Sequence, residues 1–428
     1  MRIAIVGSGI SGLSAAWLLA KRHAVTLFEA DRRLGGHTHS VDVTLGGVTR
    51  AVDTGFLVFN QRTYPNLVAL FRALGIPAAK SDMSFSLSLE QPALEWAGNS
   101  LATVFAQRLN IVRPAFLRML RDIVRFNREA SRAAAAGASP SLGEFLERGR
   151  YSAAFRDWYL LPMAAAIWSC PTRAMLDFPF SSFARFFRNH GLLQIADRPQ
   201  WYTVAGGARQ YVERMARAIP DVRLATPVTR VRRDTSGVRV MGEHFDALVL
   251  ACHSDQALAI LADGATPEER AVLGAIAYQK NRALLHTDAA VLPKRRSTWS
   301  AWNYSAGRDT PAGRPVAVHY LINKLQPLPF AEPVIVSLNP HREPAPERVL
   351  GVYDYEHPVF DQRSEHAQAA LGALQGARRT WFCGAWTRYG FHEDGLDSAL
   401  AVALSFGVQA PWAAAREIPT EEMERVAA

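Results

Sequence analysis

Short apolar runs recur along the chain and alternate with longer amphipathic segments. Residues 3–6 and 245–252 are nearly continuous apolar runs of strand length, residues 25–29 form a similar run that ends in an acid, and residues 380–384 form one that ends in glycine. Strands of a parallel sheet have this pattern because helices cover both of their faces. Residues 13–20 follow the first run and favour a helix, so the pattern predicts an α/β fold with strand–helix–strand units.

The segments between these runs have a different character. From Tyr64 to about His190 the pattern is mostly helical, and the low-complexity residues 133–141 indicate a flexible surface connection. Further strands are expected near residues 222–224 and 228–232, after a helix that ends at about Ala218. Short strands near residues 283–286, 316–322 and 334–338 indicate an antiparallel sheet.

A GxGxxG loop lies between the first apolar run and the first helix. It consists of Gly7, Gly9 and Gly12, with Ser11 before the last glycine. Glycines at this point allow a tight turn and a close approach of the backbone to a pyrophosphate at the helix N-terminus. Glu29 ends the second strand, where an acid accepts hydrogen bonds from a ribose hydroxyl and repels a 2′-phosphate. The sequence therefore predicts a Rossmann-like site for a dinucleotide other than NADP.

Residues 29–38 resemble the ExxxRxGGR segment of the amine oxidase and phytoene desaturase superfamily of flavoproteins. The resemblance implies FAD, with Arg33 near the phosphates and the paired glycines close to the diphosphate and flavin. His37 replaces the usual final arginine. Thr54, Gly55 and Phe56 resemble the next element of the superfamily, which passes the isoalloxazine ring. The cofactor contacts that this resemblance implies are Glu29, Ala30, Arg33, Gly35, Gly36, His37, Thr54, Gly55, Phe56 and, through its backbone at the adenine, Val228.

The C-terminal segment resembles the second flavin motif of the same superfamily. There a strand-end glycine, here Gly384, meets the ribityl chain, and the following helix directs its N-terminus at the flavin pyrimidine. A helix N-terminus at this position stabilises negative charge on the reduced flavin. The acid that commonly follows the glycine is replaced by Ala385-Trp386. The contacts implied by the helix are Asp394, Gly395, Leu396 and Ser398.

The resemblance also implies the fold class and the division of the chain. We expect an α/β protein with a Rossmann-like, glutathione-reductase-like FAD-binding domain and a mixed helical and antiparallel-sheet substrate domain. The FAD-binding domain is discontinuous and comprises residues 1–60, 200–255 and 345–428. Residues 61–199 and 256–344 form the substrate domain, which carries the helical insertion.

Four further segments narrow the resemblance to one group of bacterial, amine-oxidase-like flavoproteins. They are residues 52–60, 189–193, 299–304 and 390–395. This group also resembles the flavin-binding N-terminal part of plant cyclopropane fatty acid synthases. Its members tend to be associated with fatty-acyl-modifying methyltransferases, and some are regarded as desaturases of methylated acyl chains. The resemblance implies hydride transfer from a long acyl chain, in a phospholipid or free, to flavin N5, and a methyltransferase as partner.

Two residues before the second flavin motif are candidates for catalysis. His392 and Glu393 precede the flavin-facing helix and could handle a proton or tune the flavin, although helix capping and flavin hydrogen bonding explain them more simply. His37 and His39 lack further ligands for a metal, so no metal site is expected.

Two other functions remain open at this stage. A flavin amine oxidase of this superfamily would use an aromatic wall, for which Trp386 or Tyr389 is a candidate, and a lysine near N5. No lysine stands at a matching position, although Lys280, Lys294 and Lys324 fall in the expected substrate domain. A non-catalytic flavoprotein subunit of an acyl-modifying complex would use FAD structurally.

Composition and charge indicate the cellular compartment and the partners of the protein. The chain has 428 residues, a formal net charge of +9 and only three cysteines, Cys170, Cys252 and Cys383, which lie far apart among apolar residues. We expect reduced core cysteines, noncovalent FAD and a cytoplasmic protein. No nucleic-acid-binding module is recognised, so nucleic acid is not an expected partner. Between Val104 and Arg132, seven arginines are interleaved with apolar residues, which predicts either packed amphipathic helices or peripheral contact with the inner face of the membrane.

Overall fold

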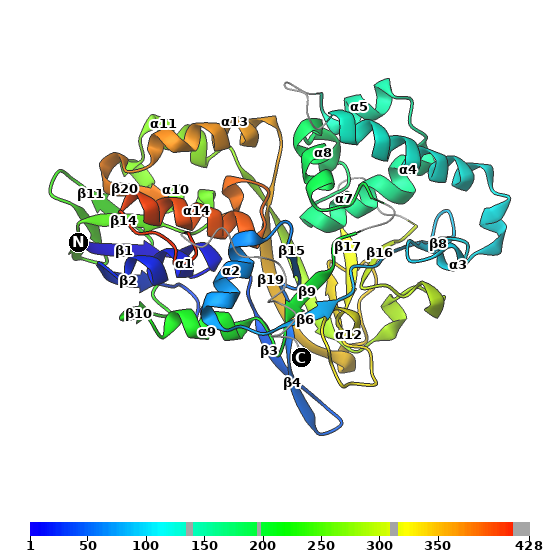
Figure 1. Cartoon of the computed structure of the whole chain (residues 1–428), viewed down its shortest axis with the longest axis horizontal. Coiled ribbons are helices and arrows are strands. Elements are labelled where there is room, and N and C mark those ends of the chain that lie inside the picture. Colours follow the sequence, from blue (N-terminus) through cyan, green and yellow to red (C-terminus); the bar gives the residue numbers. More distant parts are fainter. Residues whose placement is uncertain (134–139, 195–197, 309–315, 414–428) are drawn as a thin grey trace.

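The computed structural model describes residues 1–133, 140–194, 198–308 and 316–413. Figure 1 shows two halves, one built around a parallel sheet and the other around a larger sheet covered by helices. The predicted connection at residues 133–141 falls mostly on residues 134–139, which lie outside the described ranges.

Five parallel strands form the sheet of the first half. Across the sheet they are β10 (Asp221–Arg223), β2 (Ala24–Phe28), β1 (Arg2–Val6), β14 (Ala247–Leu250) and β20 (Thr380–Phe382). In the central strand β1, Ile5 pairs with Leu27 on one side and with Val249 on the other. The parallel sheet predicted from the apolar runs is therefore confirmed.

Successive residues of β1 face two separate hydrophobic cores. Ile3 and Ile5 pack with α1 (Ile10–Leu19), α2 (Pro65–Leu74), α9 (Arg209–Ala216) and α14 (His392–Ser405). Ala4 and Val6 face the opposite core, which contains α10 (Ser254–Leu261), α11 (Pro267–Leu273), α13 (Gln362–Ala370) and the small antiparallel sheet β11 (Val231–Arg233), β12 (Val238–Val240) and β13 (Glu243–Phe245). Coverage of both faces explains why the strand is apolar at consecutive positions.

A seven-stranded sheet forms the floor of the second half. Its order is β19 (Val349–Val359), β15 (Ala277–His286), β18 (Ile335–Leu338), β17 (Ala317–Leu321), β16 (Trp302–Ala306), β7 (Phe85–Leu89) and β8 (Leu94–Ala97). Neighbouring strands are antiparallel except β16 and β7, which are parallel. The predicted antiparallel sheet is present, but the mostly helical pattern expected from Tyr64 was wrong for β7, β8 and β6 (Ala78–Ser81), whose strands are short and mix apolar with polar residues.

Two smaller sheets complete the strands. The hairpin of β3 (Ser40–Leu45) and β4 (Val48–Asp53) projects from the molecule in Figure 1, and β5 (Phe59–Asn60), β9 (Trp201–Val204) and β6 form a three-stranded sheet.

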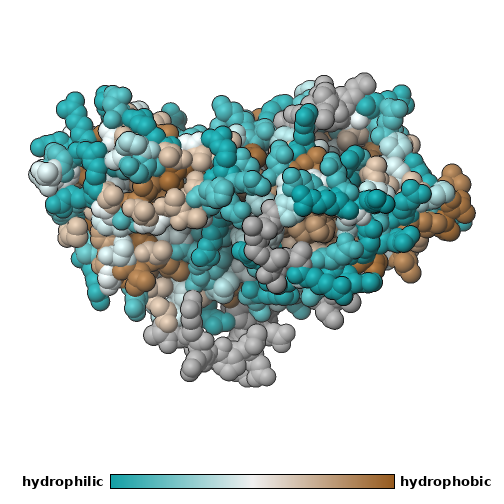
Figure 2. Space-filling model, turned by 90° about the horizontal axis from the view of Figure 1, so that it is seen from above, coloured by the Kyte–Doolittle hydropathy of each residue, from teal (hydrophilic) through white to brown (hydrophobic). Residues whose placement is uncertain are grey.

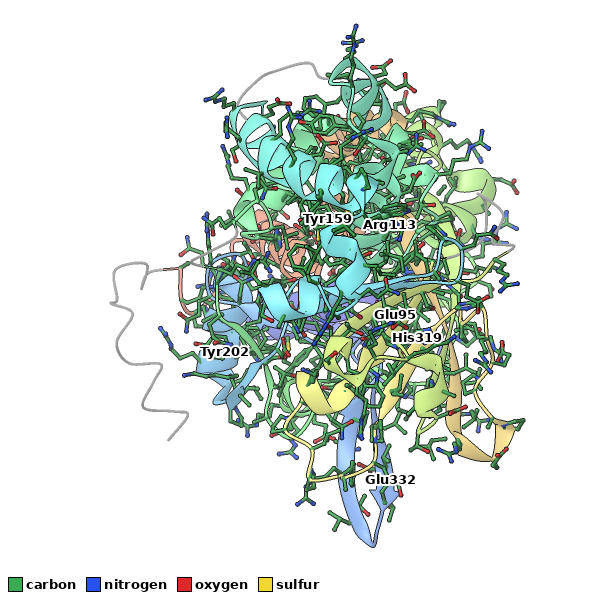
Figure 3. All side chains as sticks on the ribbon, turned by 90° about the vertical axis from the view of Figure 1, so that its right-hand side faces the viewer. Glu95, Arg113, Tyr159, Tyr202, His319 and Glu332 are labelled. Carbon is green, nitrogen blue, oxygen red and sulfur yellow. The ribbon has the colours of Figure 1, made fainter. Side chains whose placement is uncertain are left out.

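The helices of the insertion cover the seven-stranded sheet of the second half. These helices contribute many of the aromatic side chains buried in the largest hydrophobic core. Figure 3 views this end of the molecule, with Arg113 and Tyr159 labelled, and in Figure 2 hydrophobic residues gather at the same end. None of the described helices combines the length and apolar composition needed to cross a membrane. The helices are α3 (Leu101–Val104), α4 (Pro114–Ala133), α5 (Leu142–Arg148), α6 (Ala153–Phe155), α7 (Leu161–Trp168) and α8 (Phe180–Asn189), and α12 (Ile322–Leu325) lies beyond β17.

The packing departs from the predicted domain boundaries in three places. α2 packs in the core of the parallel sheet although it follows residue 60. Most of α10 and all of α11 do so although they lie beyond residue 255. β19 pairs along its length with β15 and therefore lies in the substrate sheet, although it follows residue 345. Each segment is amphipathic, and amphipathicity does not specify which of two adjacent cores it covers.

A buried ion pair links β11 to α11. The Arg233 guanidinium donates to both carboxylate oxygens of Glu269 at 2.6 and 2.7 Å, and both side chains are almost inaccessible to solvent. Removing one partner leaves the other charge buried without compensation, so we expect Glu269→Ala to lower the free energy of unfolding by about 3–5 kcal/mol. Arg148→Ala, which removes an exposed pair with Glu144, should cost less than about 0.5 kcal/mol. Denaturant unfolding measures both, and equal losses would contradict this assignment.

Candidate active site

A cavity of about 790 Å³ lies between the carboxyl ends of the parallel strands and the substrate sheet. The glycine loop and the residues after β2 line one end, and apolar side chains of the second half line the other. Most of the predicted cofactor residues form part of its wall. They are Gly7, Gly9, Ser11, Glu29, Ala30, Gly35, Gly36, His37, Thr54, Gly55, Phe56, Val228 and Gly384.

The glycine loop presents bare backbone to this cavity. A Cβ on Gly12 would lie 1.8 Å from the carbonyl oxygen of Gly7, so only glycine permits this turn into α1. A Cβ on Gly9 would meet no atom within 4 Å, and one on Gly36 would lie 3.1 Å from the Cα of Gly9. Gly9 is also the N-cap of α1 and provides no side-chain hydrogen bond to its first turn. This open backbone at a helix N-terminus fits a pyrophosphate.

Glu29 joins the end of β2 to the glycine loop. Its carboxylate accepts hydrogen bonds from the backbone N–H of Ser8 and of Asp31, each at 2.8 Å. The acid is therefore fixed at the cavity wall, where the predicted ribose contact requires it.

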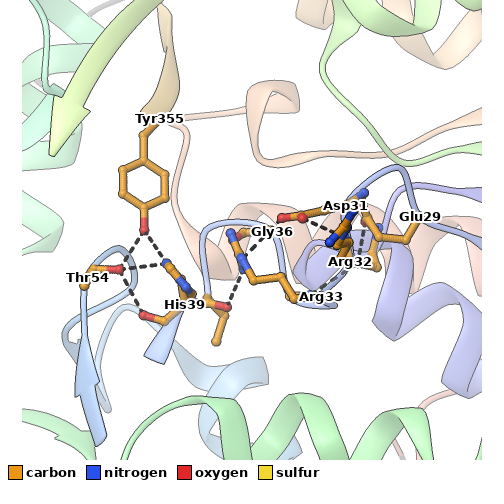
Figure 4. A network of polar contacts seen from close by, with 11 residues as sticks. Glu29, Asp31, Arg32, Arg33, Gly36, His39, Thr54 and Tyr355 are labelled. Atoms are coloured by element: carbon orange, nitrogen blue, oxygen red, sulfur yellow. Dashed lines mark hydrogen bonds and ion pairs between the residues drawn. The ribbon is translucent and has the colours of Figure 1, made fainter. Parts of the chain in front are cut away.

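Arg33 does not reach the cavity wall. Its guanidinium donates to the carbonyl oxygen of Gly36 at 2.9 Å and to that of Thr38 at 3.3 Å, and it lies 3.3 Å from Asp31, as Figure 4 shows. Arg33 thus stabilises the paired-glycine turn, and its predicted contact with the phosphates stays a prediction.

His37 occupies the wall position where the superfamily commonly has arginine. Its Nε2 is buried without a hydrogen-bond partner among the described residues. Burial, together with His357 and His253, holds the pKa of His37 well below its ordinary value, so the ring is neutral. A neutral imidazole with an unpaired polar atom at this wall fits a polar group of the bound cofactor.

The sequence analysis did not identify the histidines and the tyrosine that lie next to His37. The ring centres of His357 and Tyr355 lie 5.1 and 5.2 Å from that of His37, and all three residues line the cavity together with His253. Because His253 follows the apolar run 245–252 at the carboxyl edge of a parallel strand, its position could have been found from the sequence. His357 and Tyr355 lie on β19, and no local pattern indicates their approach.

The loop after β4 is tied to the same wall. The Thr54 hydroxyl hydrogen-bonds the Tyr355 hydroxyl at 2.7 Å and His39 Nδ1 at 3.1 Å, as seen in Figure 4. A Cβ on Gly55 would lie 2.1 Å from the carbonyl oxygen of His37. These contacts fix Phe56, which stacks on His392 with ring centres 3.8 Å apart.

His392 reaches the cavity, whereas the next residues of α14 lie behind it. His392 Nε2 lies 2.9 Å from the Thr38 hydroxyl and 3.2 Å from that of Tyr211. Burial lowers the pKa of His392 to about 3, so the ring is neutral near pH 7. Glu393, Asp394, Gly395, Leu396 and Ser398 do not line the cavity.

These residues of α14 form contacts within the protein, and their predicted catalytic and cofactor roles stay predictions. Asp394 accepts a hydrogen bond from the backbone N–H of Phe391 at 2.9 Å, and Leu396 is fully buried. A Cβ on Gly395 would lie 2.8 Å from Ile10 and Ser11, so this glycine permits close packing of α14 against α1. The Ser398 hydroxyl accepts from the backbone N–H of Gly384 at 2.9 Å and thereby acts on the cavity wall indirectly.

The other end of the cavity is apolar and aromatic. Its walls come from α7, from the loop after α8 and from strands of the substrate sheet. They include Met83, Ile167, Trp168, Leu192, Trp302, Val336 and Leu338. Tyr389 and Trp386, the predicted aromatic wall, also line the cavity.

The three cysteines differ in their exposure to the cavity. Cys170, Cys252 and Cys383 are free thiols, and Cys252 lies at the cavity wall while the other two are buried. Within the described ranges, no cluster of three or more histidine, cysteine or acidic side chains has a geometry that could hold a metal.

Glu393 caps the helix α2. Its carboxylate accepts from the backbone N–H of Asn66 at 2.8 Å and of Leu67 at 2.9 Å. Since two buried donors lose their acceptor, we expect Glu393→Ala to lower the free energy of unfolding by about 1–3 kcal/mol. Glu393→Gln keeps one acceptor and should lose less, and both variants should retain bound flavin. A Glu393→Gln variant that folds and binds flavin but cannot be reduced would show a catalytic role instead.

The neutral state of His392 predicts a pH-dependent stability. The pKa of His392 is about 3 in the folded protein and near 6.5 in the unfolded chain. The unfolded chain therefore binds the proton first, and the native state loses stability as the pH falls below about 6.5. His392→Phe lacks this titration, although it loses the contacts to Thr38 and Tyr211. Its deficit in unfolding free energy at pH 7 should therefore shrink towards pH 5, by at most about 1.4 kcal/mol per pH unit. A constant deficit in denaturant titrations would contradict a buried neutral ring.

Comparison with known proteins identifies the family of the chain. Residues 10–281, more than half of the chain, match the family described as flavin containing amine oxidoreductase. A carotenoid phi-ring synthase from Streptomyces griseus is 34% identical over 139 residues, which are 30% of this chain and 26% of that protein, so the match spans about a quarter of the relative's length.

Solved structures share the fold over nearly the whole chain. A CLA-producing fatty acid isomerase from P. acnes matches with a TM-score of 0.66 and 16% identity, over 95% of this chain and 99% of that one. Cyclohexylamine oxidase from Brevibacterium oxydans IH-35A matches with a TM-score of 0.65, 16% identity and the same coverage. With the predicted α/β fold confirmed and the FAD-binding loops in place, the chain belongs to the family of flavin containing amine oxidoreductases and is an FAD-dependent oxidoreductase.

Proposed function

We propose that this oxidoreductase desaturates a long apolar chain, most simply a fatty acyl chain. The observation that carries the proposal is the apolar end of the cavity, where aliphatic and aromatic side chains form the wall opposite the glycine loop. Ligand sites of this composition gain affinity mainly by removing apolar surface from water. The relative named a carotenoid phi-ring synthase is consistent with an apolar substrate.

The charges around the cavity favour an uncharged substrate segment. Among the described wall residues, the carboxylates are those of Glu29 and Glu356, and no lysine, arginine or aspartate is present. Glu29 is bound to the glycine loop, and Glu356 lies 3.9 Å from Lys280 Nζ and 3.6 Å from His253 Nδ1. An ammonium group at the apolar end would therefore lose its hydration without a carboxylate beside it.

The lysines considered for an amine oxidase lie elsewhere. Lys280 is 88% exposed, Lys294 is exposed, and Lys324 lies 3.4 Å from Asp82. None of the three lines the cavity. This geometry favours an acyl chain over an amine as the substrate.

The proposed reaction removes two hydrogens from adjacent carbons of the chain. When bound, FAD supplies the two-electron acceptor for a hydride, and the second hydrogen leaves as a proton to water. The apolar wall orients the chain and excludes bulk water from the carbon atoms. The neutral rings of His37 and His392 add no positive charge beside the reacting segment.

An anaerobic titration tests this function. We expect phospholipids with methylated or unsaturated acyl chains to bleach the flavin absorption band, with loss of two hydrogens from the acyl chain by mass spectrometry. Ile167→Asp places a carboxylate in the apolar wall and should slow bleaching by lipid about a hundredfold, since a buried charge disfavours an apolar ligand. Leu404→Asp, at a position that is 57% exposed, is the matched control and should bleach normally.

Each alternative function gives a different result in the same titration. Bleaching by amines and not by lipids would establish an amine oxidase. Absence of bleaching by either class, with lipid mass unchanged, would support a flavoprotein subunit that binds FAD without turnover. Released chromophore from the denatured protein identifies the cofactor independently of the substrate.

A further inference from the structure

An apolar surface patch lies at the outer end of the helical insertion. We name it the α3–α4 patch, and it consists of Leu101, Leu109, Ile111, Val112, Leu117 and Val124. Leu109, Leu101 and Val112 are 81%, 79% and 72% exposed. These six make up almost half of the thirteen large apolar residues exposed in the described ranges, yet they fall within one short segment. In Figure 2 hydrophobic residues gather at this end of the molecule.

The patch is additional to the surface that the helix α4 uses for packing. Phe116, Met119 and Phe126 are buried in the large aromatic core, so the core-facing side of α4 is already apolar and filled. Leu117 and Val124 lie on the other side of the helix, at 44% and 48% exposure. An apolar cluster that the fold leaves in water indicates an interaction surface.

The charged residues around the patch are almost all positive. Residues 101–128 contain six arginines and a single acid, Asp122, which is buried and accepts from the backbone N–H of Ser152. Arg108, Arg118, Arg121 and Arg128 are exposed and form no ion pair within the described part of the chain.

The other two arginines of this segment contact side chains of the protein itself. Arg125 lies near Asp122 and Glu129 and over the ring of Tyr151 at 3.8 Å, and Arg113 lies 4.9 Å from the ring centre of Trp158. Figure 3 shows Arg113 on the end of the molecule that faces the viewer. The four exposed arginines therefore lie among the exposed apolar residues along this segment, and the other two pack against the protein.

We propose that the α3–α4 patch docks the protein on an anionic lipid bilayer. Leu109, Ile111 and Val112 enter the boundary between headgroups and acyl chains, and the four unpaired arginines bind lipid phosphates. Both contributions are needed at an interfacial site, because apolar burial supplies the insertion and positive charge supplies the preference for anionic lipid. A nucleic-acid surface would not expose leucine and valine between its cations. The inference rests on this surface alone and does not depend on the substrate.

Vesicle sedimentation of the flavin-loaded protein tests the docking. We expect binding to vesicles of equal parts phosphatidylglycerol and phosphatidylcholine, weaker binding at high salt, and little binding to phosphatidylcholine alone. The double variant Leu109→Ser with Val112→Ser should bind about tenfold more weakly. Leu350→Ser with Leu404→Ser removes exposed apolar residues elsewhere and should bind like the unchanged protein.

A second pair of variants separates local charge from net charge. Arg118→Glu with Arg121→Glu should abolish the preference for anionic vesicles, whereas Arg217→Glu with Arg342→Glu changes the net charge equally at other exposed sites and should keep it. Flavin absorption and thermal unfolding confirm that each variant is folded.

Several outcomes would overturn the proposal. Equal binding to neutral and anionic vesicles, absence of vesicle binding, or insensitivity to both patch variants would each do so. Light scattering that showed a dimer abolished by Leu109→Ser with Val112→Ser would identify the patch as a contact between copies of the chain.

Discussion

The close contact between the first turns of α1 and α14 is the constraint on which the site depends. Gly12 allows the turn that leads into α1, and Gly395 allows α14 to approach Ile10 and Ser11 without a side chain between them. As a result, loops that are almost four hundred residues apart in sequence line one cavity. A side chain at Gly395 would separate the helix N-termini, and one at Gly12 would collide with the Gly7 carbonyl oxygen and distort the loop that leads into α1.

Buried polar contacts then hold the two halves of the molecule around the cavity. Asp53 at the end of β4 accepts from the backbone N–H of Ala208 before α9 and from the Gln326 amide after α12, while its own N–H donates to Gln326. Burial raises the pKa of Asp53 to about 7. Such contacts are directional, so they fix the relative placement of segments that hydrophobic packing alone would leave adjustable.

Prediction from the sequence was most accurate where local pattern and local chemistry coincide. Gly7, Gly9, Gly36 and Glu29 occur in a strand–turn–helix context that restricts their conformation, and the structure places all four at the cavity wall. Prediction was least accurate where a charged side chain could bind either a ligand or neighbouring backbone groups. Arg33 and Glu393 have the charge expected of site residues, yet neighbouring backbone groups bind both of them away from the cavity.

The sequence by itself determined the parallel sheet and the glycine loop of a dinucleotide site, because short-range spacing specifies the backbone turns that a dinucleotide requires. The resemblance of its motifs indicated FAD and the flavoprotein family. The tertiary structure alone decided which side chains meet across the cavity, since His357 and Tyr355 arrive on β19 from the substrate sheet. It also decided the fate of the basic amphipathic segment. One side of α4 packs its apolar residues into the core, as one interpretation expected. The opposite side also carries apolar residues among its arginines, and these stay exposed because the tertiary structure covers only one side of the helix.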